Sequence, residues 1–74
     1  MKFTDEDERI VWEKGNIIGD FNPDEYRKDD FGTWIIRNAY SDLKSEFGWV
    51  IERIDPNGGD DINNLKPVQW GNIK

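Results

Sequence analysis

Apolar residues in this chain gather in short runs that are separated by longer polar stretches. One run, preceded by acidic residues, predicts a helix over about residues 5–14. Two runs rich in β-branched and aromatic residues predict strands at 33–37 and 49–54. A final run, opened by Pro67, predicts a last helical stretch through Trp70. Together these elements indicate a small α+β domain that spans residues 1–74.

Capping signals support the first helix. Thr4 is the expected N-cap residue. Asp7, three residues later, fits a looser form of the capping box, with Asp in place of the usual Glu or Gln. The carboxylates of residues 5–8 complement the positive end of the helix dipole. Gly15 is the expected end of the helix.

Residues 16–30 are expected to be irregular. Asn22-Pro23-Asp24 predicts a turn, because proline presets φ. The segment 26–29 predicts one helical turn. Within it, the basic pair Arg27-Lys28 is followed by Asp29-Asp30. We therefore expect local ion pairs between these neighbours rather than a phosphate site.

The charge balance of the chain is acidic: ten Lys and Arg against sixteen Asp and Glu give a formal net charge of −6. Phosphate binding needs clustered positive charge, so this excess has the wrong sign for binding a bare duplex. An acidic surface suits a basic partner, such as a protein that itself handles nucleic acid. The alternative is that the charge only keeps a small protein in solution.

Composition also bears on the setting of the protein. The absence of cysteine excludes disulfides and thiolate metal sites. Four Trp, four Phe and two Tyr residues compensate in part for the small core that 74 residues allow. No apolar run approaches the ~20 residues of a membrane span, and the acidic N-terminus does not resemble a signal peptide. We therefore expect a cytoplasmic protein that makes no membrane contact.

The second predicted strand opens an ordered motif. Gly48-Trp49-Val50-Ile51-Glu52-Arg53-Ile54-Asp55-Pro56 is followed by Gly58-Gly59 and then by Asn64-Leu65-Lys66-Pro67. This order resembles the core of the HNH nuclease family, in which small bacterial members read Gly-Trp-x-Ile-Asp-His-Ile-x-Pro, then Gly-Gly, then Asn-Leu-x-Pro-Leu. Over residues 12–74 the resemblance implies an HNH-like ββα domain. A short β-hairpin would be flanked by the N-terminal helix and by a truncated C-terminal helix.

The resemblance also implies where the family's site would lie. The acidic metal ligand corresponds to Glu52, and the general-base histidine corresponds to Arg53. The asparagine of the family name, which braces the loop in such folds, is kept. A later histidine is replaced by glutamine, and of a closing asparagine pair only the first remains. The five positions, called the motif positions below, are Glu52, Arg53, Asn64, Gln69 and Asn72.

The chemistry of the family needs groups that this chain lacks. There is no histidine anywhere in the sequence. The general base of such a nuclease titrates near neutrality, whereas Arg53 cannot give up its proton in a protein. Its fixed charge would also repel a metal ion. The loop after Pro56 is shorter than in the family, and the chain ends at Lys74, where the family's metal-bearing helix continues. We therefore expect no catalytic residue, no metal site, no cofactor and no enzymatic activity.

These features together suggest a binding function. We expect a small acidic inhibitor that binds a nucleic-acid-handling protein, of the phage anti-defence or anti-CRISPR type. The expected partner contacts are the charged residues Asp29, Asp30, Asp60, Asp61 and Arg53. One alternative is a residual nuclease that uses Glu52 and Asn64 with Mg²⁺. Others are a direct RNA- or DNA-binding module, which the net charge disfavours, and a subunit of a larger assembly.

Overall fold

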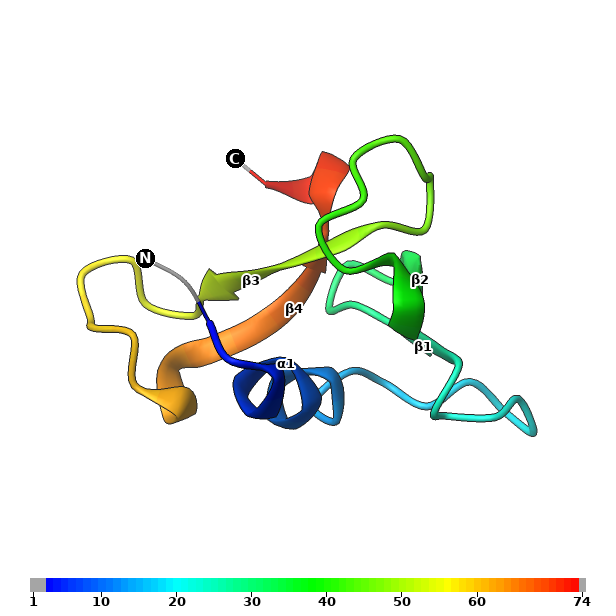
Figure 1. Ribbon diagram of the computed structural model, residues 1–74, viewed down its shortest axis with the longest axis horizontal. Helices are drawn as coiled ribbons and strands as arrows, with labels where there is room; N and C mark the ends of the chain where they lie inside the picture. Colours follow the sequence, from blue (N-terminus) through cyan, green and yellow to red (C-terminus); the bar gives the residue numbers. More distant parts are fainter. Residues whose placement is uncertain (1–2, 74) are drawn as a thin grey trace.

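One helix and two antiparallel β-hairpins make up the fold (Figure 1). A computed structural model describes residues 3–73. The α+β class predicted from the sequence is confirmed. In chain order the helix and strands are α1 (Asp5–Trp12), β1 (Tyr26–Lys28), β2 (Trp34–Ile36), β3 (Trp49–Arg53) and β4 (Leu65–Gln69). Short 3-10 turns follow or precede the strands at η1 (Arg37–Ala39), η2 (Ile62–Asn64) and η3 (Trp70–Asn72).

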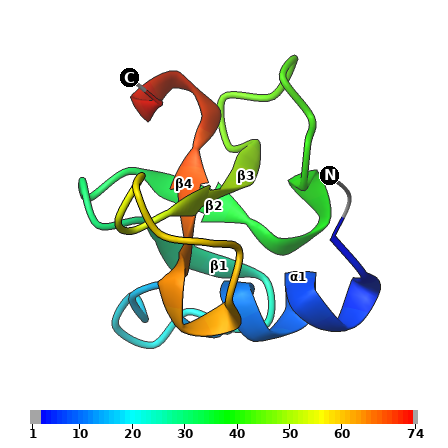
Figure 2. The ribbon, with the colours of Figure 1, turned by 90° about the vertical axis from the view of Figure 1, so that its left-hand side faces the viewer.

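Helix α1 begins with the predicted capping box in complete form. The Thr4 hydroxyl accepts the Asp7 N–H at 3.0 Å, and the Asp7 carboxylate accepts the Thr4 N–H at 3.0 Å. The helix ends at Trp12, two residues before the predicted end and three before Gly15. Figures 1 and 2 place it beside β4. Within residues 3–73 no helix is long and apolar enough to cross a bilayer.

Two segments that were expected to be helical are strands, and these predictions were wrong. Residues 26–28 pair with 34–36 as β1 and β2. The outer edge of β1 also exchanges two backbone hydrogen bonds with Asn16, at 2.8 and 2.9 Å. Residues 65–69 form β4, so the predicted C-terminal helical stretch from Pro67 to Trp70 is absent. β1 pairs with the next strand along the chain and with Asn16, and β4 pairs with β3 across the intervening loop. In both cases strand pairing overrode the local helical signal.

The core contains tryptophans from both halves of the chain. Trp12 and Trp49 are buried, with ring centroids 5.4 Å apart. Their indole N–H groups reach loop carbonyls, that of Trp12 at Pro23 (2.8 Å) and that of Trp49 at Arg37 (3.3 Å). Trp70 stays 38% exposed, although its indole N–H donates to the Ser45 carbonyl at 2.7 Å. The tryptophans therefore fasten irregular segments as well as filling the core.

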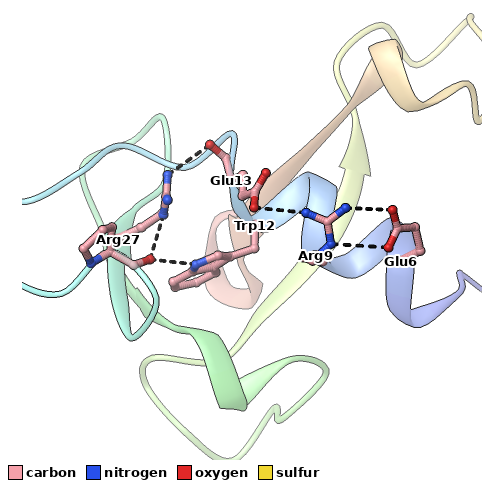
Figure 3. Close-up of polar contacts among 6 residues, drawn as sticks. Glu6, Arg9, Trp12, Glu13 and Arg27 are labelled. Atoms are coloured by element: carbon pink, nitrogen blue, oxygen red, sulfur yellow. Dashed lines mark hydrogen bonds and ion pairs between the residues drawn. The ribbon is translucent and has the colours of Figure 1, made fainter.

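Arg27 fastens the loop after α1, and the local ion pairs expected for it do not form. Its guanidinium donates to the backbone carbonyls of Pro23 (2.9 Å), Glu13 (3.0 Å) and Gly15 (3.0 Å). Figure 3 shows this side chain next to Trp12, which shares the Pro23 carbonyl. Asp29 turns the other way, toward the second hairpin. Buried backbone carbonyls must be satisfied, and here an arginine does so.

Candidate functional site

An open pocket of about 630 Å³ lies at the Arg53 end of the β3–β4 hairpin. Three of the motif positions, Glu52, Arg53 and Asn72, line it. Aliphatic and aromatic side chains supply most of the remaining wall. The lining residues are Phe3, Phe31, Ile51, Glu52, Arg53, Ile54, Pro56, Asp60, Leu65, Lys66 and Asn72.

Arg53 is held by an ion pair across the loop. Its Nε atom lies 2.8 Å from Oδ1 of Asp60, and one terminal nitrogen donates to the Pro56 carbonyl at 3.5 Å. The hydrogen bond from Arg53 and, to a smaller extent, its charge lower the pKa of Asp60, while the same contact raises the pKa of Arg53. Arg53 is therefore a permanent cation with a counter-charge beside it.

Glu52 is a strand residue whose cross-strand neighbour is a lysine. It lies opposite Lys66 in the β3–β4 register. The ammonium of Lys66 in turn sits over the Phe31 ring, 5.6 Å from its centroid. Among residues 3–73 no group of three or more Asp, Glu, His or Cys side chains is arranged to hold a metal ion. This part of the pocket therefore combines a carboxylate, an ammonium and an aromatic ring.

Asn64 braces the loop between β3 and β4, as predicted. Its Oδ1 atom accepts the Asp55 N–H at 2.9 Å, and its Nδ2 atom donates to the carbonyls of Asp55 (3.0 Å) and Gly59 (2.8 Å). A Cβ atom at Gly58 would lie 2.6 Å from Nδ2, so the brace requires a glycine there. Asn64 thus holds the loop (yellow in Figure 2) together with the pair of Arg53 and Asp60.

Gln69 and Asn72 are used to join segments of the fold. The Gln69 side chain donates to the Glu46 carbonyl at 3.0 Å and accepts the Gly71 N–H at 2.7 Å. The Asn72 amide donates to Asp29 Oδ2 at 2.8 Å and to the Thr33 hydroxyl at 2.9 Å. All five motif positions lie in the hairpin or directly after it, but only Glu52, Arg53 and Asn72 reach the pocket.

The structure corrects one of the expected partner contacts. Asp29 is 1% exposed, so its carboxylate cannot meet a partner at the surface. Its neighbour Asp30 is exposed, as is Asp61, and Asp60 is partly covered by its pair with Arg53. Sequence reasoning missed the structural role of Asp29. The spacing before Gly32 and Thr33 was the available signal, because aspartate often accepts backbone N–H groups of a following turn.

The chain matches no protein-family model, and no curated protein or solved structure is significantly similar to it. The resemblance to HNH nucleases therefore stays a prediction that rests on the motif.

Proposed function

We propose that this protein is a non-catalytic, HNH-like binding protein that inhibits a nucleic-acid-handling protein of basic charge. The observation that carries the proposal is the ion pair of Arg53 with Asp60, at 2.8 Å. A general base must accept a proton near neutral pH, and the pKa of this arginine is raised further by its partner. Arg53 is therefore suited to contribute a permanent positive charge to an interface with a partner.

The remaining motif positions support the same conclusion. Asn64, Gln69 and Asn72 are engaged in hydrogen bonds that hold loops and segment ends. Their amides are therefore occupied in the folded protein. Keeping such residues for stability, without a base beside them, is expected of a scaffold that binds rather than cleaves.

The distribution of charge favours a protein partner over nucleic acid. The formal net charge is −6. Two of the basic side chains are already engaged within the fold: Arg27 is buried against backbone carbonyls, and Arg53 is paired with Asp60. A basic surface that normally holds phosphates is complementary to an acidic protein of this kind. An anti-defence inhibitor, such as an anti-CRISPR protein, would act in this way.

A cleavage assay and a capture experiment test the proposal. Purified protein incubated with plasmid or RNA in Mg²⁺, Mn²⁺ or Zn²⁺ is expected to leave both intact. Metal-dependent cutting that Glu52→Ala abolishes would overturn the proposal. Capture from a bacterial lysate is expected to enrich a basic, nucleic-acid-handling protein, and the enrichment should weaken as salt rises. Recovery of no such protein at moderate salt would also contradict it.

A further inference from the structure

The outward-facing backbone groups of β3 can be identified from the hydrogen bonds at the two ends of its ladder with β4. The Ile54 N–H donates to the Asn64 carbonyl at 2.7 Å, and the Trp70 N–H donates to the Gly48 carbonyl at 3.1 Å. In the register 50↔68 and 52↔66, these bonds show that the even-numbered residues of β3 direct their N–H and C=O groups toward β4. The N–H and C=O groups of Ile51 and Arg53 therefore point away from β4.

Three structural features block the outer edge of β4. The outward N–H of Gln69 donates to the buried carboxylate of Asp29 at 2.9 Å. Pro67 has no N–H to leave unpaired. The outward carbonyl of Leu65 accepts the ammonium of Lys14 at 2.9 Å. Edge strands that are blunted in this way cannot be extended by another chain.

The outer edge of β3 is closed only at its start. The Ser41 N–H donates to the Trp49 carbonyl at 2.8 Å, where Tyr40 forms a parallel bridge with Trp49. At Ile51 and Arg53 no backbone group of residues 3–73 pairs with the outward N–H or C=O. In Figure 1 no second strand follows β3 on the side away from β4. One edge of the hairpin is thus protected and the other is left open.

We propose that this open edge, at Ile51 and Arg53, receives an extended basic peptide segment of the partner as an additional β-strand. The segment would exchange backbone hydrogen bonds with the two outward residues, as in other cases of strand addition. The pocket beside the edge would receive its side chains. The inference rests on the proposed function for the nature of the partner, and it adds where and how that partner binds.

Like charges argue against a second copy of this chain as the occupant. An antiparallel pairing about a two-fold axis at residue 52 would set Glu52 opposite its own copy. An axis at residue 53 would do the same with Arg53. An axis at Ile51 would set Arg53 opposite Trp49, where Ser41 already occupies the edge. Like charges directly opposite each other destabilise a strand pair.

The chemistry of the pocket specifies the sequence of the added strand. Two carboxylates (Glu52 and Asp60) and two cations (Arg53 and Lys66) line the pocket, and Arg53 is already paired with Asp60. A basic residue opposite Glu52 on the added strand would share that carboxylate with Lys66, which lies on the other side of Glu52 in the hairpin. The flanking residue opposite Ile51 would point to the other face, where Phe3 and Leu65 line the pocket. Successive side chains of a strand alternate between faces. An alternation of Lys or Arg with an aliphatic residue therefore fits the edge.

The test uses the whole protein labelled with ¹⁵N and a capped peptide of three Lys-Val repeats. Bound peptide is expected to slow amide exchange at Ile51 and Arg53 by at least about tenfold, because their N–H groups become hydrogen-bonded. A peptide with N-methyl groups at alternate residues cannot pair along one edge and should lose most of this effect. A Glu-Val peptide of the same length should not bind.

Two protein variants complete the design. Ile51→Pro removes the outward N–H but no ladder hydrogen bond, and it mirrors Pro67 directly across the hairpin. Glu52→Gln keeps the backbone edge and removes the charge of the side chain. It should therefore weaken binding of the Lys-Val peptide and leave binding of a Thr-Val peptide unchanged. Because Ile51→Pro could disturb folding, the N-methylated peptide gives an independent result. The inference would be overturned if the Lys-Val peptide and its N-methylated form bound equally well. It would also be overturned if amide exchange slowed only at residues other than Ile51 and Arg53.

The outcomes separate the two proposals. If a basic partner is captured but exchange at Ile51 and Arg53 is unchanged in that complex, strand addition is wrong and the proposed function stands. If the peptide pairs with the edge and no nucleic-acid-handling protein is captured, the proposed function is wrong and strand addition at this edge stands. Exchange that slows with protein concentration in the absence of peptide would identify a second copy as the occupant and overturn the proposed one.

Discussion

The carboxylate of Asp29 accepts the backbone N–H of Gln69 at 2.9 Å, joining the end of β1 to the outer edge of β4. The same oxygen accepts the Asn72 amide at 2.8 Å, and the other oxygen accepts the N–H groups of Phe31 (3.0 Å) and Thr33 (2.9 Å). A buried carboxylate is costly unless it is hydrogen-bonded. Here four donors surround it, and it holds the two hairpins together.

Replacing Asp29 should therefore destabilise the whole fold. Asp29→Ala leaves up to four donors without an acceptor, and we expect a loss of at least about 3 kcal/mol in the free energy of unfolding. Urea denaturation followed by tryptophan fluorescence measures it. The matched control is Asp30→Ala, at an exposed neighbour, for which we expect a change within about 0.5 kcal/mol. Similar values for the two variants would contradict the role of Asp29.

The elements that could be predicted from the sequence are those whose signals are local. Thr4 and Asp7 mark the start of α1, and the β-branched and aromatic runs mark β2 and β3. The strands β1 and β4 could not be recognised in this way. The pairing of Lys28 depends on Asn16 and Trp34. Pro67 fits β4 because its nitrogen faces the outer edge, which only the register reveals.

The candidate site was predictable to a similar extent. The motif placed Glu52 and Arg53 together at the end of a strand, and both line the pocket. Charge alone did not show that Arg53 is committed to Asp60, or that Asp29 is buried. The pair of Arg53 with Asp60 depends on how the loop after β3 folds back, and the burial of Asp29 depends on contacts with residues about forty positions along the chain. Exposure and pairing of a charged residue are tertiary properties, and spacing carries little information about them.

The glycine that precedes β3 is required by a close approach of two backbones. A Cβ atom at Gly48 would lie 1.9 Å from the carbonyl oxygen of Asp42, whereas one at Gly59 would meet nothing within 4 Å. We expect Gly48→Ala to lower the free energy of unfolding by about 2 kcal/mol or more. Gly59→Ala should change it by less than about 1 kcal/mol, in the stabilising direction. Thermal unfolding of the pair measures this difference, and equal midpoints would refute it.

Asn64 should be required for the order of the loop rather than for any activity. Asn64→Ala removes three hydrogen bonds to Asp55 and Gly59. At about 1 kcal/mol for each bond, we expect a loss of about 2–3 kcal/mol. Amide exchange should quicken in residues 55–59. The control is Asn63→Ala, at an exposed position in the same turn. Unchanged exchange in the Asn64 variant would show that the loop is held by other contacts.

The pair of Arg53 with Asp60 should make the loop sensitive to acid. Because the hydrogen bond from Arg53 lowers the pKa of Asp60 in the folded protein, the pair stabilises the fold above the unfolded pKa of that carboxyl. This contribution is lost as the pH falls through the lowered folded pKa. Both side chains are partly exposed, so the effect is small and salt weakens it.

An NMR titration of the Asp60 carboxyl carbon checks the direction of this shift. The midpoint should lie below that of an ordinary aspartate. Arg53→Met, which keeps the length of the side chain and removes its charge, should move the midpoint back up. Arg9→Met, which breaks the exposed pairs of α1 with Glu6 and Glu13, should leave it unchanged. A midpoint that stays low in Arg53→Met would mean that other groups hold Asp60 ionised, and Arg53 would then be available to a partner.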